Sequence, residues 1–152
     1  MRLSSSAFSS GGQVPARFTC EGQDVPPPLS WSDPPAEARS FALVCSDPDA
    51  PGGTFYHWAI YDIPHATSAI DEHWLARGAW PQQAINDFGR RGYSGPCPPP
   101  GQTHRYVFGL YALGSERLNV AGRTQCRDVE AAAAAKAIAT ADLVGVYRCG
   151  RR

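Results

Sequence analysis

The sequence has no excess of charge of either sign. Its 152 residues include 14 Lys or Arg and 14 Asp or Glu, which gives a formal net charge of +0. Extended binding to nucleic acid and loose docking on anionic membranes both require a surplus of basic residues. The balance argues against both classes of partner, so an anion that binds this chain must do so in a local pocket.

Long apolar runs are missing as well. The longest apolar stretches are far shorter than the about 20 residues of a membrane-spanning helix, and the opening Met1-Arg2-Leu3-Ser4-Ser5-Ser6 is polar, unlike a secretory leader. We therefore expect a cytoplasmic location without integral membrane association. Hydrophobic residues still make up 43% of the chain, which predicts one globular domain over residues 1–152.

The cysteines show neither zinc-finger spacing nor a disulfide framework. There are five of them, an odd number, at Cys20, Cys45, Cys97, Cys126 and Cys149. Together with a cytoplasmic location, this pattern predicts reduced thiols.

Short apolar runs separated by Pro and Gly predict many strands and turns. The 14 Pro and 15 Gly are spread along the chain and do not mark a linker. The strongest strand candidates are Phe41–Cys45, His57–Ile63, Tyr106–Leu113 and Leu143–Tyr147, with weaker ones near Ala16–Thr19 and Leu29–Trp31.

One helix is predicted late in the chain, with Asp128 as its N-cap and the alanine-rich residues 130–138 as its body. A weaker helix is predicted over 71–77. Because most elements are strands and the main helix comes late, the pattern indicates a β-rich α+β domain or a sandwich.

Two segments place a loop stiffened by Pro or Gly beside a histidine that begins an apolar run. The first is Asp47-Pro48-Asp49-Ala50-Pro51, followed by His57, and the second is Gly92-Tyr93-Ser94-Gly95-Pro96, followed by His104. Rigid loops next to strands commonly hold a few polar groups around a small ligand. Both segments are therefore candidates for one binding site.

Strand alternation predicts which side chains share a face. One face of the third strand carries His104, Tyr106 and Phe108, and one face of the second carries His57, Ala59 and Tyr61. If the strands are neighbours, Asp47, His57, His104 and Tyr106 converge at one end of the sheet.

Such a cluster suits a phosphate-like anion. A nearby carboxylate raises the pKa of an imidazole, so His57 and His104 would donate hydrogen bonds together with the Tyr106 hydroxyl. Gly95 would let backbone N–H groups face the anion, and the prolines that follow it would stiffen the loop. If the imidazoles must be protonated, anion affinity falls as the pH rises through their pKa values.

The motifs resemble those of the phosphatidylethanolamine-binding proteins, in particular their bacterial branch. Besides the two segments above, the resemblance rests on Pro27-Pro28-Leu29-Ser30-Trp31, Ser40-Phe41-Ala42-Leu43, Asn86-Asp87-Phe88-Gly89 and His104-Arg105-Tyr106. It implies a mainly β sandwich with a large central antiparallel sheet, a smaller packed sheet and a short C-terminal helix. It also implies a pocket for phosphate or a phospholipid head group.

By motif, the family's pocket positions correspond to Asp47, His57, Gly95, Pro96, His104 and Tyr106. Its framework positions correspond to Asp49, Pro51 and Arg105, and we expect Arg105 to pair with Asp49. Cys97 lies in the pocket loop, where a small buried filler is the expected role and a redox group the alternative.

The leading interpretation is a non-enzymatic binding protein without cofactor or metal. One alternative is a modulator of a protein partner, such as a kinase or protease, that acts through the pocket rim. Another is a hydrolase with His57 or His104 as general base, Asp47 as its orienting group and Cys97 as a conceivable nucleophile. A metal site built from His57, His104 and Asp47 and purely structural histidines at strand ends also remain open. The resemblance further suggests a homodimer.

Overall fold

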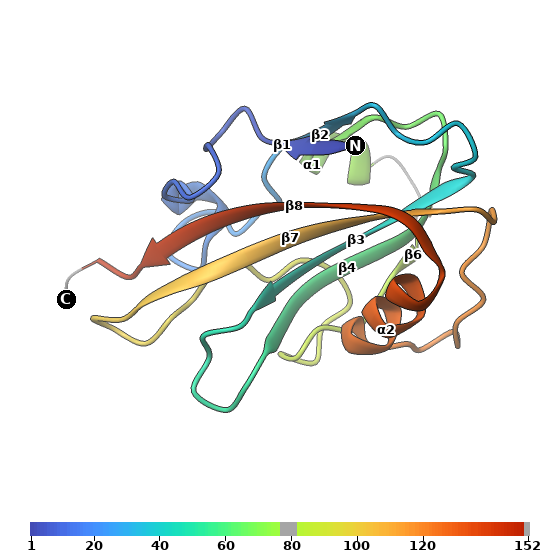
Figure 1. The fold of residues 1–152 in the computed structure, drawn as a ribbon. Coiled ribbons are helices and arrows are strands. Elements are labelled where there is room, and N and C mark those ends of the chain that lie inside the picture. Colours follow the sequence, from blue (N-terminus) through green and yellow to red (C-terminus); the bar gives the residue numbers. More distant parts are fainter. Residues whose placement is uncertain (77–81, 151–152) are drawn as a thin grey trace.

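The computed structural model describes residues 1–76 and 82–150, and strands dominate it (Figure 1). The larger sheet has five antiparallel strands, in the order β6 (Gln82–Gln83), β4 (Phe55–Pro64), β3 (Ser40–Asp47), β7 (Thr103–Leu113) and β8 (Ala137–Arg148). The smaller sheet has three antiparallel strands, in the order β1 (Arg2–Ser4), β2 (Leu29–Ser32) and β5 (Ala69–Ile70).

The large sheet lies between two layers. The small sheet covers one face, and helix α2 (Cys126–Lys136) lies on the opposite side in Figure 1. Alternate residues of β3 point into the two cores: Phe41 and Leu43 face the small sheet, whereas Ala42 and Val44 face α2. Because both faces of the strand are buried, it reads as a continuous apolar run. The predicted sandwich with a large central antiparallel sheet is confirmed.

The four main predicted strands are present, each extended by a few residues into β3, β4, β7 and β8, and the weak candidate at Leu29–Trp31 is β2. The candidate near Ala16–Thr19 is wrong, because these residues form the 3₁₀ helix η1 (Ala16–Phe18). Pro15 fixes the backbone at its start, and the Thr19 hydroxyl donates to the Ala16 carbonyl. Local turn chemistry therefore overrides the strand propensity.

The predicted N-cap of the main helix is also wrong. Helix α2 begins at Cys126, with Gln125 as its N-cap, and Asp128 lies within its first turn. Tertiary contacts set this start, since the N–H of Cys126 donates to the carbonyl of Ile85 and the Cys126 side chain is buried. At its other end the helix leaves Ala137 in extended backbone, and Ala137 begins β8.

The weaker predicted helix is the single turn α1 (Glu72–Leu75), whose N-cap Asp71 accepts a hydrogen bond from the N–H of Trp74. The end of that prediction, Arg77, lies outside the described residues. No helix in the described part of the chain has the length and apolar character needed to cross a bilayer.

Candidate functional site

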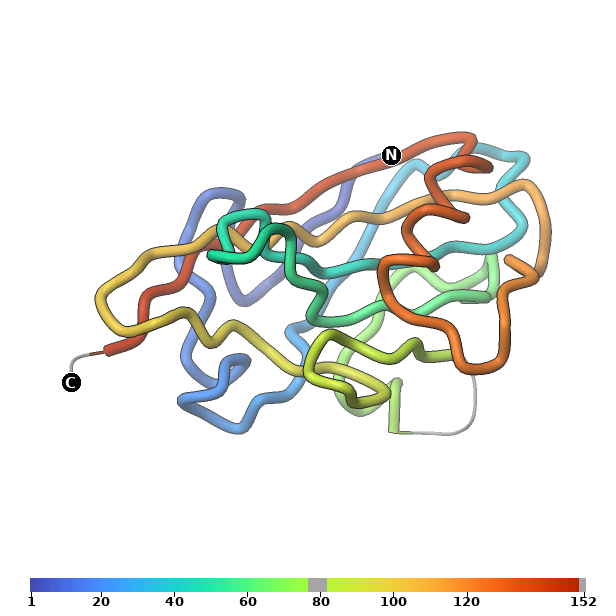
Figure 2. Tube along the Cα trace, turned by 90° about the horizontal axis from the view of Figure 1, so that it is seen from below, coloured from blue at the N-terminus to red at the C-terminus, as the bar shows by residue number. Residues whose placement is uncertain are grey.

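A cavity of about 150 Å³ opens at one end of the large sheet. The loop between β3 and β4 and the loop that leads into β7 lie at this same end (Figures 1 and 2). Antiparallel order explains the convergence, because β3 ends where its neighbours β4 and β7 begin. The lining residues are Asp47, Ala50, Pro51, Phe55, His57, Phe88, Cys97, Pro98, Pro99, His104 and Tyr106.

The convergence of Asp47, His57, His104 and Tyr106, predicted from the sequence, is thus present in the structure. A wider depression of about 330 Å³ lies elsewhere, against β2, β5 and α1. Among the described residues that line it, Asp71 is the one with an ionisable side chain. We therefore take the smaller cavity as the candidate site, since it brings together several convergent polar groups.

His57 reaches the cavity through a β-bulge in β4. Cys45 of β3 pairs with Trp58, and the next residue, Ser46, pairs with Tyr56, so His57 is the extra residue in the ladder. A bulge redirects side chains and strengthens the local twist. The His57 ring consequently faces the cavity on the same side of the sheet as Trp58.

Strict alternation along the strand predicted the wrong neighbours for the His57 side chain. Ala59 and Tyr61, predicted to share its face, pack in the other core against α2. Instead the His57 ring meets Tyr106 edge-on, with 5.4 Å between the ring centroids. The sequence pattern could not reveal this, because a bulge leaves the apolar run unbroken.

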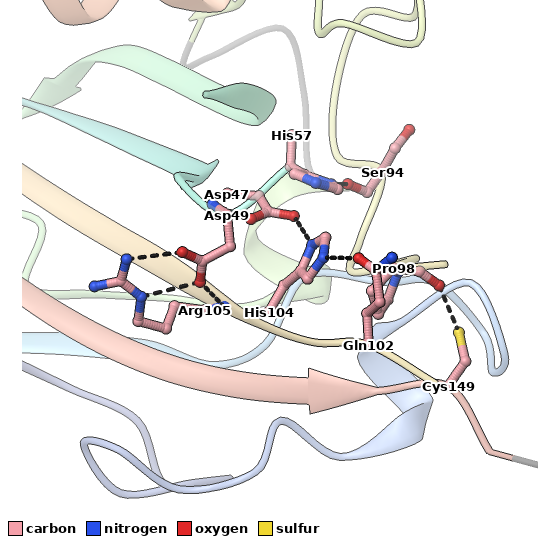
Figure 3. A network of polar contacts seen from close by, with 9 residues as sticks. All are labelled: Asp47, Asp49, His57, Ser94, Pro98, Gln102, His104, Arg105 and Cys149. Carbon is pink, nitrogen blue, oxygen red and sulfur yellow. Dashed lines mark hydrogen bonds and ion pairs between the residues drawn. The ribbon is translucent and has the colours of Figure 1, made fainter. Parts of the chain in front are cut away.

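The tautomer of His57 follows from its hydrogen bond to the backbone. Its Nδ1 lies 2.7 Å from the carbonyl oxygen of Ser94 (Figure 3), and a carbonyl only accepts, so Nδ1 carries the proton. Burial lowers the pKa of His57, and the Ser94 carbonyl and the Asp47 charge only partly offset it. The raised pKa predicted for this histidine is therefore wrong, because desolvation of the charged ring outweighs its neighbours.

His104 is held at both ring nitrogens. Nδ1 lies 2.7 Å from Asp47 Oδ2, and Nε2 lies 2.8 Å from Gln102 Oε1 (Figure 3). Asp47 accepts from Nδ1, and the Gln102 side-chain amide lies beside Nε2, so both ring nitrogens have a hydrogen-bond partner. The Asp47 and His104 side chains are only 5% and 4% exposed, so this hydrogen-bonded pair is buried. Gln102 was missed, although its position two residues before His104 could have revealed it.

Tyr106 brings an unused hydrogen-bond donor to the cavity. Its side chain is fully buried, and its hydroxyl makes no hydrogen bond of acceptable geometry with any described residue. Burial and the nearby Asp47 charge raise the pKa of Tyr106, so the phenol keeps its proton. Buried polar groups without a partner are rare in native proteins and call for an explanation.

Gly95 and Pro96 lie behind the cavity wall and are absent from its lining. The N–H of Gly95 donates to Asp24 Oδ1 over 2.8 Å, so this N–H is not available for the anion-binding nest predicted there. A methyl group on Gly95 would lie 2.2 Å from the carbonyl oxygen of Phe18, which explains why glycine is needed. The carbonyl of Pro96 accepts from the N–H of Cys20. Both residues therefore position the loop.

The predicted pair between Asp49 and Arg105 is present. Arg105 donates from Nε to Asp49 Oδ2 over 2.9 Å, from Nη2 to Oδ1 over 2.8 Å and from its backbone N–H to Oδ2 (Figure 3). These hydrogen bonds lower the pKa of Asp49 to about 2. They fix the loop that carries Ala50 and Pro51, so Pro51, predicted as framework, also lines the cavity.

The prediction of reduced thiols is wrong for one pair. Cys20 and Cys97 form a disulfide with Cα atoms 5.4 Å apart. Cys97 is therefore neither a buried filler nor a thiol nucleophile. Spacing could not reveal this pair, since 77 residues separate the two cysteines in the chain.

Two phenylalanines of the rim were missed as well. Phe88 is 45% exposed at the mouth, and its ring lies 4.8 Å from that of Phe55 and 5.6 Å from that of His57. Asn86 shapes this loop, since its side-chain oxygen accepts from the N–H groups of Phe88 and Arg90. Phe55 was detectable from the sequence, because it precedes His57 by two residues on the same strand.

Histidine and carboxylate groups occur together here without forming a metal site. No group of three or more His, Cys, Asp or Glu residues in positions 1–76 and 82–150 is arranged to hold a metal ion. The remaining histidines, His65 and His73, are exposed and do not line the cavity.

Comparison with known proteins gives matches along nearly the whole chain. A family model described as phosphatidylethanolamine-binding protein matches residues 4–148. A UPF0098 protein of Aquifex aeolicus is 42% identical over 151 residues, covering 97% of this chain and 88% of that protein. LppC of Mycobacterium tuberculosis, named as a candidate lipoprotein, is 41% identical over 149 residues, covering 97% and 72%. The crystal structure of Escherichia coli YbcL, described as a new member of the mammalian PEBP family, matches with a TM-score of 0.90, 31% identity and 98% coverage of each chain.

Proposed function

Since the chain belongs to the phosphatidylethanolamine-binding protein family, we propose that it is a non-enzymatic binding protein whose cavity takes a phosphate-like anion. The anion is either a free phosphorylated small molecule or the head group of a phospholipid. One observation carries the proposal: the Tyr106 hydroxyl is buried, without a hydrogen-bond partner among the described residues, at the wall of a cavity bordered by two histidines. A bound oxyanion would satisfy it.

The size of the cavity limits how much of a ligand it can enclose. About 150 Å³ accommodates a phosphoryl group but leaves little room beyond it. The remainder of a larger ligand would lie along the rim, against Phe88, Pro98 and Pro99. Apolar contacts there would add affinity for the body of the ligand, while the floor recognises its anionic group.

Calorimetric titration tests the proposal and separates the two ligand sources. Inorganic phosphate and phosphoethanolamine serve as soluble probes, and phosphatidylethanolamine vesicles as the lipid probe. Binding of the soluble probes that weakens in Tyr106→Phe and His104→Ala, but not in the control His65→Ala at an exposed loop position, supports the proposal. No binding of any probe below the millimolar range contradicts it. Binding to vesicles alone assigns the head group as the ligand.

A hydrolase fits this geometry less well. Asp47 orients His104 as a general-base mechanism requires, but Gln102 occupies the other ring nitrogen of His104. Cys97 cannot attack as a thiolate while it is bonded to Cys20. We expect no turnover of phosphoester or ester substrates, and turnover that His57→Ala abolishes would reverse this conclusion.

The exposed rim favours a second candidate function, the modulation of a protein partner such as a kinase or protease. Phe88 projects from the mouth of the cavity and is one of two large apolar side chains among the described residues that are exposed. Aromatic residues are enriched in protein interfaces. Capture of a partner that Phe88→Ala abolishes while phosphate affinity is unchanged would separate this function from simple anion binding. Homodimer formation stays a prediction, which analytical ultracentrifugation tests.

The cytoplasmic location also stays a prediction, and the Cys20–Cys97 disulfide argues against it because cytosolic thiols are normally kept reduced. Alkylation of intact cells before lysis, followed by mass analysis of the protein, decides the question. A reduced pair supports the cytoplasm, whereas an oxidised pair indicates an oxidising compartment.

A further inference from the structure

The hydrogen-bonding pattern of the cavity specifies a protonation state for its ligand. We propose, on the basis of the anion-binding function above, that the cavity selects an oxyanion that still carries a proton, such as the monoanion of a phosphomonoester. Its O–H would donate to His57 Nε2, and its free oxygens would accept from the Tyr106 hydroxyl.

His57 presents an acceptor to the cavity. Because its Nδ1–H is donated to the Ser94 carbonyl, the neutral ring keeps a lone pair on Nε2. Nδ1 makes the 2.7 Å hydrogen bond to Ser94, and the ring borders the cavity, so Nε2 is the ring nitrogen that a ligand can approach. A fully deprotonated oxyanion offers only lone pairs and would meet Nε2 acceptor to acceptor.

The charged groups around the cavity also favour a singly charged ligand over a dianion. Among the described residues that line the cavity, only His57 and His104 have side chains that can carry a positive charge, and the Asp47 carboxylate already pairs with His104. No Lys or Arg within residues 1–76 and 82–150 lines the cavity, and Arg105 is paired with Asp49. A dianion would therefore face the Asp47 carboxylate without an unpaired cation, which disfavours the more highly charged form.

A fully deprotonated ligand could accept a hydrogen bond from His57 Nε2 only if His57 itself were protonated. The titratable groups around its ring are Asp47 of β3 and His104 of β7, and Asp24 from the loop before β2 acts on it electrostatically. Phe55, Phe88 and Tyr106 pack around the ring. Despite the two carboxylates, burial dominates and lowers the pKa of His57. Around neutral pH the ring stays neutral, so the proton between ring and ligand must come from the ligand.

Three small anions distinguish the effect of an O–H group on the ligand from the effect of the ligand's net charge. Methyl phosphate is a monoanion with an O–H below its second pKa of about 6 and a dianion above it. Dimethyl phosphate is a monoanion without an O–H, and sulfate is a dianion without one. Calorimetric titration of the unaltered protein with each anion, from about pH 5.5 to about pH 8, gives the affinities around that second pKa.

We expect methyl phosphate to bind best at the acid end and to lose about tenfold in affinity per pH unit above its second pKa. Dimethyl phosphate should bind at least about tenfold more weakly, as for one lost hydrogen bond, with no matching pH dependence. The ³¹P chemical shift of bound methyl phosphate at about pH 8 should be that of the monoanion, which free methyl phosphate has left at this pH.

The variant His57→Phe removes the acceptor, so it should bring methyl and dimethyl phosphate within about threefold of one another. Tyr106→Phe should weaken both anions alike, and His65→Phe, the same replacement at an exposed histidine, should change neither. The titrations of the unaltered protein test the proposal by themselves, so it can be refuted even if the His57→Phe variant does not fold.

Three results would overturn the proposal. Affinity for methyl phosphate that rises with pH means that the dianion is preferred. A parallel loss of methyl and dimethyl phosphate binding with rising pH means that an imidazole, and not the ligand, supplies the proton. Sulfate binding as tight as that of methyl phosphate at the acid end removes the need for a proton altogether. If none of the anions binds at any pH, the proposed function itself fails, which is a distinct result.

Discussion

Cys20 and Cys97 are joined by a disulfide, and Cys97 is at the same time part of the cavity wall. The bond ties the loop that carries Pro98 and Pro99 to the segment after η1. The backbone N–H of Cys20 also donates to the carbonyl of Pro96, so the two segments are linked covalently and by a hydrogen bond. The shape of the cavity thus depends on a cross-link between two segments that lie 77 residues apart in the chain.

Reduction of this disulfide should lower both stability and anion affinity. A loop of 77 residues predicts a loss of about 4 kcal/mol in the free energy of unfolding, because the unfolded chain regains its freedom. Urea unfolding of the protein with and without dithiothreitol measures the loss. Cys149→Ser, which keeps the disulfide, is the control and should unfold like the unaltered protein. An unchanged urea midpoint after complete reduction would contradict the prediction.

The unpartnered hydroxyl of Tyr106 should cost stability in the free protein. Tyr106→Phe removes a buried donor without a partner, so we expect the free energy of unfolding to stay the same or rise by about 1 kcal/mol. Anion affinity should fall roughly tenfold to a hundredfold, as for one hydrogen bond to a charged group. The matched control is Tyr111→Phe, whose hydroxyl donates to Glu130 Oε2 over 2.8 Å. It should unfold about 1.5 kcal/mol more easily and leave affinity unchanged. Equal destabilisation of both variants would contradict the assignment.

Close packing at Gly95 predicts a steric cost for any side chain. In Gly95→Ala the new methyl group would meet the Phe18 carbonyl, Asp24 and the Tyr93 hydroxyl, the last at 2.9 Å. We expect a loss of roughly 1–3 kcal/mol in thermal or urea unfolding. Gly52→Ala is the control, since no atom lies within 4 Å of its Cβ position, and it should be neutral or slightly stabilising. A neutral Gly95→Ala would show that the loop adjusts without cost.

The pair between Asp49 and Arg105 should be visible in an acid titration. Because the pKa of Asp49 is lowered to about 2, its stabilising contribution is complete above the ordinary aspartate pKa of about 3.9 and is lost as the pH falls through about 2. NMR titration of the Asp49 carboxyl should give the low pKa in the unaltered protein and an ordinary one in Arg105→Ala. The control Arg127→Ala breaks the pair with Asp87 and should leave Asp49 unaffected. An ordinary Asp49 pKa in the unaltered protein would contradict the assignment.

Local sequence patterns predicted which helices and strands are present better than the residues at which they begin and end. The apolar runs in β3 and β7 are recognisable because the strands are buried on both faces, and the family motifs then specified the sandwich. The start of α2 and the conformation of Ala16–Phe18 were mispredicted, since tertiary contacts at Cys126 and the turn at Pro15 decide them.

The candidate site was likewise predicted in part from the sequence. The sequence placed Asp47, His57, His104 and Tyr106 at one end of a sheet, because antiparallel neighbours bring the end of one strand beside the starts of the next. It could not show the bulge that turns His57 toward Tyr106, nor the burial that lowers the pKa of His57. Gln102, Phe55 and Phe88 were not identified as site residues either, although Gln102 and Phe55 each precede a chosen histidine by two residues.

What the sequence determined by itself is the set of strands, the family and the polar groups gathered at one end of the large sheet, since these follow from local periodicity and contiguous motifs. Only the tertiary structure decided the pairing of Cys20 with Cys97, the commitment of the Gly95 N–H to Asp24 and the unused hydroxyl of Tyr106. Each of these depends on which atoms meet across distant parts of the chain, and hydrogen bonds, disulfides and desolvation act over a few ångströms that no sequence spacing records.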